Sequence, residues 1–373
     1  MNTKPIEIIQ DITELQANWN ATIKLSNLDN VFVTYEWLTC WLKVYAPNKK
    51  QFIICIKENE SVIALAPLII LSVKELGLPF RRLQFIGYES CDYMDFIIHK
   101  EHPECLGLIF DCIQENKKKW DYCELHDISG GSKNLLHINK ILGEKKQLFK
   151  VFKDNICPYI LLDSSVDAFL NNRTGKFIYQ LRRAVTMLEK FGNLSYEKIL
   201  DKNQALQELP LFLDMLLMRE RIVNRITNSK NIDNRSEIFK QYIENENMWP
   251  NIDFSKLCID NKAIAYHFGF KYNKKACWYA PTFDINYIEP APGKLLVKYS
   301  IEYAITNNYK EFDFLRGGEM YKFDWTKEYR DNFCLFMSNN KLISKFLFYW
   351  LLIIKPAFRK AKQSLKILKK KAF

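Results

Sequence analysis

The residues best suited to chemistry lie in the last third of the chain, around one strand-to-helix turn. Pro292-Gly293-Lys294 follows an expected strand and begins an expected helix. The first turn of a helix has unpaired N–H groups and the positive end of the helix dipole, so it can hold a pyrophosphate. Proline suits that turn, and glycine allows a ligand to come close. An ordinary strand-to-helix turn uses the same residues, so the motif alone leaves both interpretations open.

Two acidic residues near this turn could accept a proton. Asp284 comes directly after an expected strand, and Asp313 alternates with two phenylalanines, which turns its side chain to the opposite face of its strand. A carboxylate held in such a place can act as a general base. Asp313 could equally pair with Lys310 or Arg316, and the sequence does not decide between the two roles.

Three further side chains are secondary candidates for proton transfer. His267 stands between two aromatic residues of an expected strand, and a lone strand histidine is more often a hydrogen-bonded structural residue than a base. Tyr279 and Tyr321 could donate a proton or bind an oxyanion. Most of the 19 tyrosines are nevertheless expected to be packing residues.

Four basic residues could bind an anionic substrate. Arg182 and Arg183 lie on an expected amphipathic helix, and Arg316 and Lys322 flank the pair Gly317-Gly318 after an expected strand. Guanidinium groups bind phosphate through two parallel hydrogen bonds and so orient it. A solvated helix face is the alternative explanation for the pair of arginines.

The elements that must position these residues occur in the same order in both halves of the chain. In the first half we expect strands at residues 51–57, 62–71, 82–86 and 93–98, a helix from 103 and a strand at 120–126. The second half repeats the pattern, with strands at 256–259, 263–272 and 276–283, a helix from 292 and a strand at 310–315. Laying the two helix–strand units over each other places Glu124 opposite Asp313. The fold class predicted is α/β (α+β), with two tandem lobes that each contain a mixed sheet and flanking helices.

The length of 373 residues also suits two domains. We expect a first lobe at 1–155, a second lobe at 156–338 and a C-terminal amphipathic, basic segment at 339–373. The second lobe includes a helical connector at 164–235, with helices at 166–170, 177–191 and 204–221. Residues 224–234 are polar and are expected to form a loop.

The ten cysteines do not form a metal motif. No two of them are spaced as CxxC, and Cys123 and His126, three apart in an expected strand, would point to opposite faces. His102 and Cys105 have a similar spacing and stand alone. Reduced cysteines in the core of a cytoplasmic protein are the interpretation favoured, with no metal cofactor. The first residues lack the apolar stretch of a secretory signal, which also favours the cytoplasm.

The positive charge is concentrated at the C-terminal end. The net charge is +11, and residues 341–373 contain ten basic residues and no acidic one, which leaves about +1 for the rest. A near-neutral body does not favour nucleic-acid binding. Residues 346–354 are continuously apolar but much shorter than the roughly 20 residues that span a bilayer.

An apolar run beside a basic cluster is typical of a segment that lies in the plane of an anionic membrane. We therefore expect residues 341–373 to attach the protein to the inner face of the cell membrane. A terminal helix docked on the second lobe, and a nucleic-acid-binding tail, are the alternatives.

Three stretches of the second half resemble a known family. They are residues 179–192, residues 265–296 and residues 312–325, and their most specific part is the series Phe283-Asp284, Pro292-Gly293, Phe312-Asp313-Phe314 with Arg316-Gly317 and Trp325. The chain is similar here to the CelD-like, cellulose-biosynthesis-type branch of the GNAT acyltransferases, which is related to the FemAB peptidyltransferases. Phe32, Trp37, Trp41 and Asp92-Tyr93 extend the resemblance into the first half. Members of this branch have two tandem GNAT-like lobes.

The resemblance implies an acyltransferase that uses acetyl-CoA or another acyl-CoA as co-substrate. It implies that Pro292, Gly293, Lys294, Leu295 and Leu296 bind the cofactor's pyrophosphate, although most GNAT enzymes have a glycine-rich loop there. The acceptor implied is a sugar or lipid-linked sugar precursor of a cell-surface polysaccharide. Two alternatives stay open: an aminoacyl-tRNA-dependent transferase acting on a cell-wall precursor, and a non-catalytic, membrane-bound assembly factor with a degenerate site.

Overall fold

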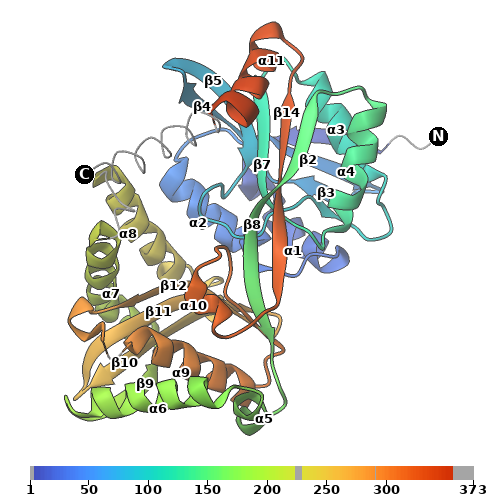
Figure 1. The fold of residues 1–373 in the computed structure, drawn as a ribbon. Coiled ribbons are helices and arrows are strands. Elements are labelled where there is room, and N and C mark those ends of the chain that lie inside the picture. Colours follow the sequence, from blue (N-terminus) through green and yellow to red (C-terminus); the bar gives the residue numbers. More distant parts are fainter. Residues whose placement is uncertain (1–3, 223–228, 290, 356–373) are drawn as a thin grey trace. The chain divides into compact units, whose positions relative to one another are not determined.

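The computed structural model describes residues 4–222, 229–289 and 291–355 and divides the chain into two compact units (Figure 1). Unit 1 contains the start of the chain to Leu28, the segment Lys50–Asp154 and the chain from Asn332 onward; unit 2 contains Asp29–Lys49 and Asn155–Asp331. Residues 29–49 lie with the second unit, and residues 332–355 lie with the first.

Unit 1 combines two sheets with helices. One sheet has the strand order β1-β2-β3-β6, with bounds Ile6–Ile9, Ile53–Glu58, Ser61–Ala66 and Ile97–Ile98. The other contains β4, β5, β7 and β14, with bounds Leu68–Glu75, Leu78–Phe85, Tyr122–Ser129 and Tyr329–Ser338. The helices are α1 (Gln16–Leu25), α3 (Cys105–Glu115), α4 (Lys133–Glu144) and α11 (Leu342–Tyr349), the last continued by the π-helical segment η5 (Trp350–Ile354).

Unit 2 is built on a mixed sheet in the order β8-β13-β12-β11-β10-β9. The strand bounds are β8 Phe149–Leu161, β9 Leu194–Lys198, β10 Ile252–Ile259, β11 Lys262–Tyr272, β12 Lys275–Phe283 and β13 Glu311–Asp313. Its helices are α2 (Tyr35–Tyr45), α5 (Val166–Asn171), α6 (Gly175–Glu189), α7 (Lys202–Ile222), α8 (Ser229–Glu244), α9 (Pro292–Thr306) and α10 (Met320–Phe323), with short turns η2 (Val31–Val33) and η4 (Ile285–Tyr287).

Tight turns connect the three central strands of unit 2. Asp260 and Asn261 join β10 to β11, Asn273 and Lys274 join β11 to β12, and all four have positive φ. Two consecutive residues with positive φ form the type I′ turn, whose twist matches that of antiparallel strands. The two turns lie where the sequence predicts them.

Helices cover both faces of the unit 2 sheet (Figure 1). On one face α5, α6 and α9 pack through a core that includes Phe177, Leu181, Leu296 and Trp278. On the other face the ring of Phe212 from α7 packs against rings of β10 and β11, and α2 packs against α8. The sheet is therefore buried on both sides, which explains why every residue of β10 is buried, including Asp253, Ser255 and Lys256.

The α/β fold class and the mixed sheets are as predicted, but several elements differ from their expected ranges. The single strand expected at 62–71 is two strands, β3 and β4, and the loop expected at 224–234 is helical from Ser229 onward. The strands β8, β9 and β14 and the helix α4 were not expected. The polar sequence of α8 is helical because its later turns bury Ile238, Phe239 and Tyr242, so tertiary packing outweighs local preference.

The C-terminal segment packs on unit 1 and not on the second lobe. Leu347 and Phe348 of α11 are buried against Phe80, Tyr122 and Phe336 of the unit 1 sheet. Residues 356–373, which hold most of the predicted basic tail, lie outside the described part. No helix within the described residues is long and apolar enough to cross a membrane.

Candidate active site

The candidate site is built on the strand–helix–strand unit β12–α9–β13. The two strands run parallel, and Lys275, Ala276 and Cys277 pair with Glu311, Phe312 and Asp313. β12 then continues to Phe283, whereas the N–H of Phe314 bonds instead to the carbonyl of Pro158 in β8. The parallel pairing therefore ends after the first three residues of β12, and the rest of the strand continues to Phe283, from which the turn η4 leads to the start of α9.

Two of the predicted site residues cause β13 to end here. The carboxylate of Asp313 accepts a hydrogen bond from the N–H of Leu315 at 2.7 Å, and Leu315 itself has a φ of 58°. The ammonium group of Lys322 donates to the carbonyls of Leu315, Arg316 and Gly317 at 3.3, 2.8 and 3.2 Å. This closed loop turns the chain away from β12.

Lys322 therefore cannot bind substrate as the sequence led us to expect. Its side chain is 4% exposed, and the ammonium also pairs with Glu319 at 3.0 Å. A buried ammonium needs such partners, because burial without them is costly. We reassign Lys322 to the structural role of holding the loop that follows β13.

The start of α9, where the sequence predicts a phosphate site, has no side chain capping its first turn. Pro292 is in the first turn, and Ala291 before it has a φ of 55°. A Cβ added at Gly293 would lie 3.3 Å from the ring of Phe283, so a side chain larger than glycine fits tightly there. The guanidinium of Arg219, from α7, lies 4.8 Å from the centroid of the same ring and donates to the carbonyl of Pro281 at 2.8 Å. A cation thus lies next to the helix start.

Lys294 joins this helix start to its neighbours. Its ammonium group donates to Gln180 of α6 at 2.8 Å, lies over the ring of Phe177, and is 3.5 Å from Asp324. Its backbone N–H bonds to the carbonyl of Ala291, which leaves fewer free amides in this turn than the sequence suggested.

Leu295 and Leu296 differ from their predicted role. Both side chains are fully buried in the core beneath α9, at 0% exposure. They fix the position of the helix, so any contribution to cofactor binding is limited to their backbone groups.

Asp284 and Tyr321 lie at the two ends of this unit. Asp284 follows β12 and accepts the N–H of Asn286 at 2.9 Å, which caps the short turn η4. Tyr321 follows β13 and is 37% exposed, with its ring 6.5 Å from that of Phe314. Tyr279 is half-buried within an aromatic cluster, 5.0 Å from the ring of Phe270. Of the two tyrosines, only Tyr321 has the exposure that proton transfer requires.

His267 is removed from solvent and acts as a packing residue. It is 1% exposed, and its ring is stacked on Trp278 with centroids 4.0 Å apart. Burial, helped by the charge of Lys198, lowers the pKa of His267 well below its usual value. Because a base must reach the proton that it removes, we no longer regard His267 as a catalytic candidate.

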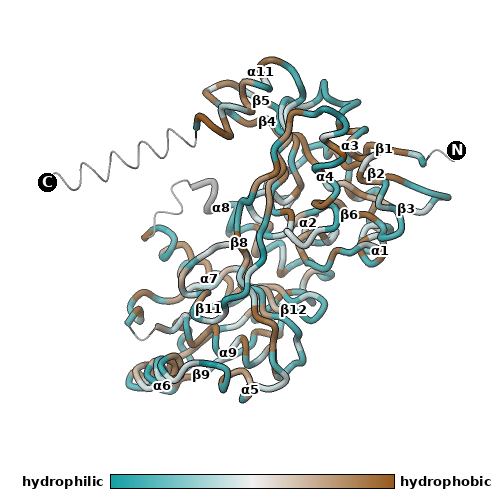
Figure 2. Tube along the Cα trace, turned by 45° about the vertical axis from the view of Figure 1, so that its right-hand side comes forward, coloured by the Kyte–Doolittle hydropathy of each residue, from teal (hydrophilic) through white to brown (hydrophobic). Residues whose placement is uncertain are grey.

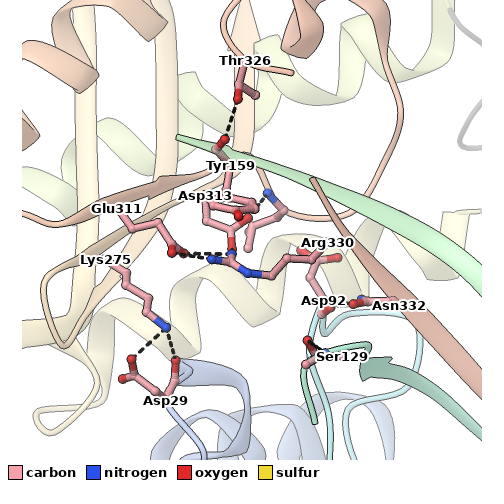
Figure 3. Close-up of polar contacts among 12 residues, drawn as sticks. Asp29, Asp92, Ser129, Tyr159, Lys275, Glu311, Asp313, Thr326, Arg330 and Asn332 are labelled. Carbon is pink, nitrogen blue, oxygen red and sulfur yellow. Dashed lines mark hydrogen bonds and ion pairs between the residues drawn. The ribbon is translucent and has the colours of Figure 1, made fainter. Parts of the chain in front are cut away.

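Asp313 is one of two buried acids that bind the same arginine (Figure 3). Arg330 donates to Asp313 at 3.1 Å and to Glu311 at 2.9 Å, and its guanidinium stacks 3.7 Å above the ring of Tyr159. The acid side chains are 4% and 8% exposed. Asp313 faces away from its neighbouring phenylalanines, and of the two roles that the sequence left open it has the ion pair. Arg330, which binds it, was not indicated by the sequence.

The remaining basic candidates do not gather at one point. Arg182 and Arg183 are exposed on α6, and within the described residues neither forms an ion pair. They share that helix with Gln180, which binds Lys294. Arg316 is half-buried in the loop held by Lys322.

The sequence did not indicate three residues of this site. Glu311 precedes Asp313 by two positions, so the alternation that singled out Asp313 could have found it. Arg219 and Arg330 had no local signal, because each meets its partners only through the tertiary fold. No group of three potential metal ligands occurs within residues 4–222, 229–289 and 291–355.

Comparisons with known proteins agree with this architecture. Residues 175–323 match the model of the acetyltransferase (GNAT) domain. The structure resembles the crystal structure of FemX, with a TM-score of 0.61 and 11% identity over 88% of this chain and 96% of that one. The comparison with curated proteins gives no match.

Two further solved structures are similar. One is a conserved protein from Bacteroides thetaiotaomicron, with a TM-score of 0.56 and 13% identity over 90% of this chain and all of that one. The other is the C-terminal domain of a lysylphosphatidylglycerol synthetase from Agrobacterium fabrum, with a TM-score of 0.55 and 11% identity over 91% of this chain and 96% of that one. At these identities the similarity concerns the fold alone.

The strand–helix–strand site lies within the matched segment, so this part of the chain is a GNAT-type acetyltransferase domain. Its fold is similar to that of FemX over most of both chains. The CelD-like branch inferred from the motifs stays a prediction.

Proposed function

We propose that the protein transfers an acyl group from acyl-CoA to an amine or hydroxyl of a sugar precursor used in cell-surface polysaccharide synthesis. The observation that carries the donor half of this proposal is the end of the β12–β13 pairing beside the first turn of α9. An extended thioester can lie along an unpaired strand edge while its pyrophosphate meets the helix start.

The basic and small residues at that helix start suit a pyrophosphate. Gly293 leaves room, and Arg219 and Lys294 supply positive charge on either side of the turn. Arg219 is already oriented by the carbonyl of Pro281. An arginine held in this way loses little side-chain freedom on binding a phosphate.

The chemistry requires the acceptor to attack the thioester carbonyl and the C–S bond to break. The acceptor loses one proton, and the thiolate of coenzyme A gains one. Tyr321, in α10 and partly exposed, is the proposed donor of the proton to the thiolate. Asp284 is the remaining candidate to take the acceptor's proton, because Asp313 is engaged by Arg330 and Leu315.

The acceptor half of the proposal depends on α6. Arg182 and Arg183 expose two guanidinium groups on the helix whose Gln180 binds Lys294. Such a pair suits the phosphate of a nucleotide-linked or lipid-linked sugar. Loss of turnover in the double variant Arg182→Ala/Arg183→Ala, with acetyl-CoA binding unchanged, is the expected result.

Calorimetric titration of acetyl-CoA into the full chain tests the donor site. The wild-type protein should bind, and Gly293→Trp should abolish binding because the new side chain fills the space before Phe283. Gly107→Trp is the matched control, since a Cβ at this glycine of α3 has nothing within 4 Å. Thermal melting of both variants checks that the fold is kept.

Two other results would select another function. No binding of acetyl-CoA, together with acyl transfer that depends on aminoacyl-tRNA, would identify the FemAB-type alternative. A biological phenotype that survives Asp284→Ala and Asp313→Ala, but not deletion of residues 344–373, would identify a non-catalytic assembly factor.

A further inference from the structure

The C-terminal helix of unit 1 has two apolar sides, and only one of them is covered. Leu347 and Phe348 are buried against the sheet, and the rings of Phe348 and Phe336 are 5.6 Å apart. The opposite side carries an outer stripe, which we define as Leu342, Phe346, Tyr349 and Ile353, exposed by 86%, 49%, 49% and 56%. These residues are spaced by four, three and four positions, so they lie along one side of a helix.

A second apolar element lies next to the end of this stripe. The β4–β5 hairpin turns at Leu76 and Gly77, both with positive φ, and exposes Leu76 and Leu78 by 48% and 56%. We call these two leucines the hairpin tip. The ammonium of Lys355, just after η5, donates to Glu75 at 2.9 Å and so joins the end of the helix to the hairpin.

The C-terminal helix and the β4–β5 hairpin pack into the same hydrophobic cluster, so their positions relative to each other are fixed within unit 1. Val73 of β4 and Phe80 of β5 belong to the same cluster as Leu347, Phe348 and residues 350–352. Figure 1 shows α11 beside β4 and β5, and Figure 2 colours much of α11 and η5 as hydrophobic. One surface of unit 1 therefore exposes apolar side chains from two elements that are distant in sequence.

We propose that the outer stripe and the hairpin tip together dock unit 1 in the plane of an anionic membrane. Lys74, Lys341 and Lys345 are exposed on these elements, and the sequence after Lys355 adds seven basic residues and no acidic one. Apolar and aromatic side chains that enter the interface, with cations at the headgroups, give this mode of binding. This inference does not depend on the proposed acyl transfer.

The positive charge of the C-terminal segment favours a membrane, rather than a second copy of the chain, as the partner of this apolar surface. A self-association through this surface would bring two segments together, each with ten basic residues and no acidic one between positions 341 and 373. Like charges at such a density oppose that contact, whereas anionic lipid is attracted by it.

Co-sedimentation of the full chain with vesicles tests the proposal. Vesicles of phosphatidylcholine with phosphatidylglycerol should bind the wild-type protein, and vesicles of phosphatidylcholine alone should not. Leu342→Ser/Ile353→Ser should weaken binding about tenfold or more, as should Leu76→Ser/Leu78→Ser. Leu136→Ser is the matched control, because this leucine of α4 is 73% exposed and lies outside both elements.

The outcomes that would overturn the proposal are specific. It fails if both double-serine variants bind like the wild type, since the basic segment would then act alone. It fails also if wild-type protein ignores anionic vesicles, or forms a dimer that Leu342→Ser/Ile353→Ser dissociates. All variants should bind acetyl-CoA like the wild type, so a failure here is separate from a failure of the proposed activity.

Discussion

Each unit contains a helix that leads into a strand parallel to an earlier one, and the two copies differ most where the helix begins. In unit 1, β5 pairs with β7 from Arg82 and Tyr122; in unit 2, β12 pairs with β13 from Lys275 and Glu311. Tyr122 and Glu311 are equivalent in the predicted overlay, so the structure gives Glu124 and Asp313 the same register. The repeat found in the sequence is confirmed at this level.

The chemistry at the two helix starts is opposite. Glu104 precedes α3, and its carboxylate is bound by Lys4, so this helix start has an acidic residue that is already paired. Gly293 and Lys294 begin α9, with the cation of Arg219 close by. The start of α3 therefore has an acidic residue with its own cation, whereas the start of α9 has a glycine and a lysine.

The largest expected effect is a difference in stability between removing the arginine that binds Asp313 and removing the arginine that binds Glu124, the acid at the equivalent position. Arg330→Ala leaves Glu311 and Asp313 buried without their common partner, and we expect a loss of about 3–5 kcal/mol in the free energy of unfolding. Arg82→Ala should cost about 1–2 kcal/mol, because Glu124 keeps His126 at 3.1 Å. Urea unfolding measures both losses, and equal losses would contradict the difference expected between the two arginines.

The same local reasoning explains what the sequence could and could not reveal. Alternation in β13 predicted the face of Asp313, and the Pro292-Gly293 pair predicted the start of α9. The partner of Asp313 is 17 positions away at Arg330, and Arg219 lies 62 positions before the carbonyl that it binds, so no local pattern contains either contact. Lys322 looked available in the sequence, and only the folded loop shows that three carbonyls enclose it.

The cations near the two helix starts should differ in their effect on acetyl-CoA binding. Arg219→Ala should raise the dissociation constant for acetyl-CoA about tenfold, which corresponds to about 1.4 kcal/mol. Lys4→Ala removes the cation next to α3 and should leave that constant unchanged. Calorimetry on both variants decides the point; an equal effect of the two would argue against α9 as the donor site.

The two buried histidines should give pH dependences of opposite sign. Burial tends to lower the pKa of His126, but hydrogen bonds with Asp154, Cys334 and Glu124 outweigh burial and raise it. The stabilisation from His126 is complete below its unfolded pKa of about 6.5 and decreases as the pH rises above that value. The pKa of His267 is lowered, so stability should rise with pH up to about 6.5 and then stay constant.

Melting temperatures measured across pH 5–9 test the opposite pH dependences expected for His126 and His267. His126→Gln should remove the decrease above pH 6.5, and His267→Gln should remove the rise below it. Slopes that both variants leave unchanged would show that other groups dominate the titration.

The smallest expected effect is the change in stability when either of two helical glycines is replaced by alanine. Gly107→Ala should stabilise unit 1 by about 0.5–1 kcal/mol, because a methyl group there meets nothing within 4 Å and limits the unfolded chain. Gly293→Ala should bring no gain, because its methyl group presses on the ring of Phe283 at 3.3 Å. Chemical denaturation of the two variants distinguishes these outcomes, and an equal gain would contradict the crowding inferred at α9.

The strand β14 has a consequence for the order in which the protein is made. Every segment of unit 2 has been synthesised once the ribosome passes Asp331, but unit 1 then still lacks the strand that pairs with β7. The sheet that contains β4, β5 and β7 must therefore wait for the last quarter of the unit's chain before it is complete. During translation the catalytic unit has its full complement of strands first, and the unit with the apolar helix α11 is finished last.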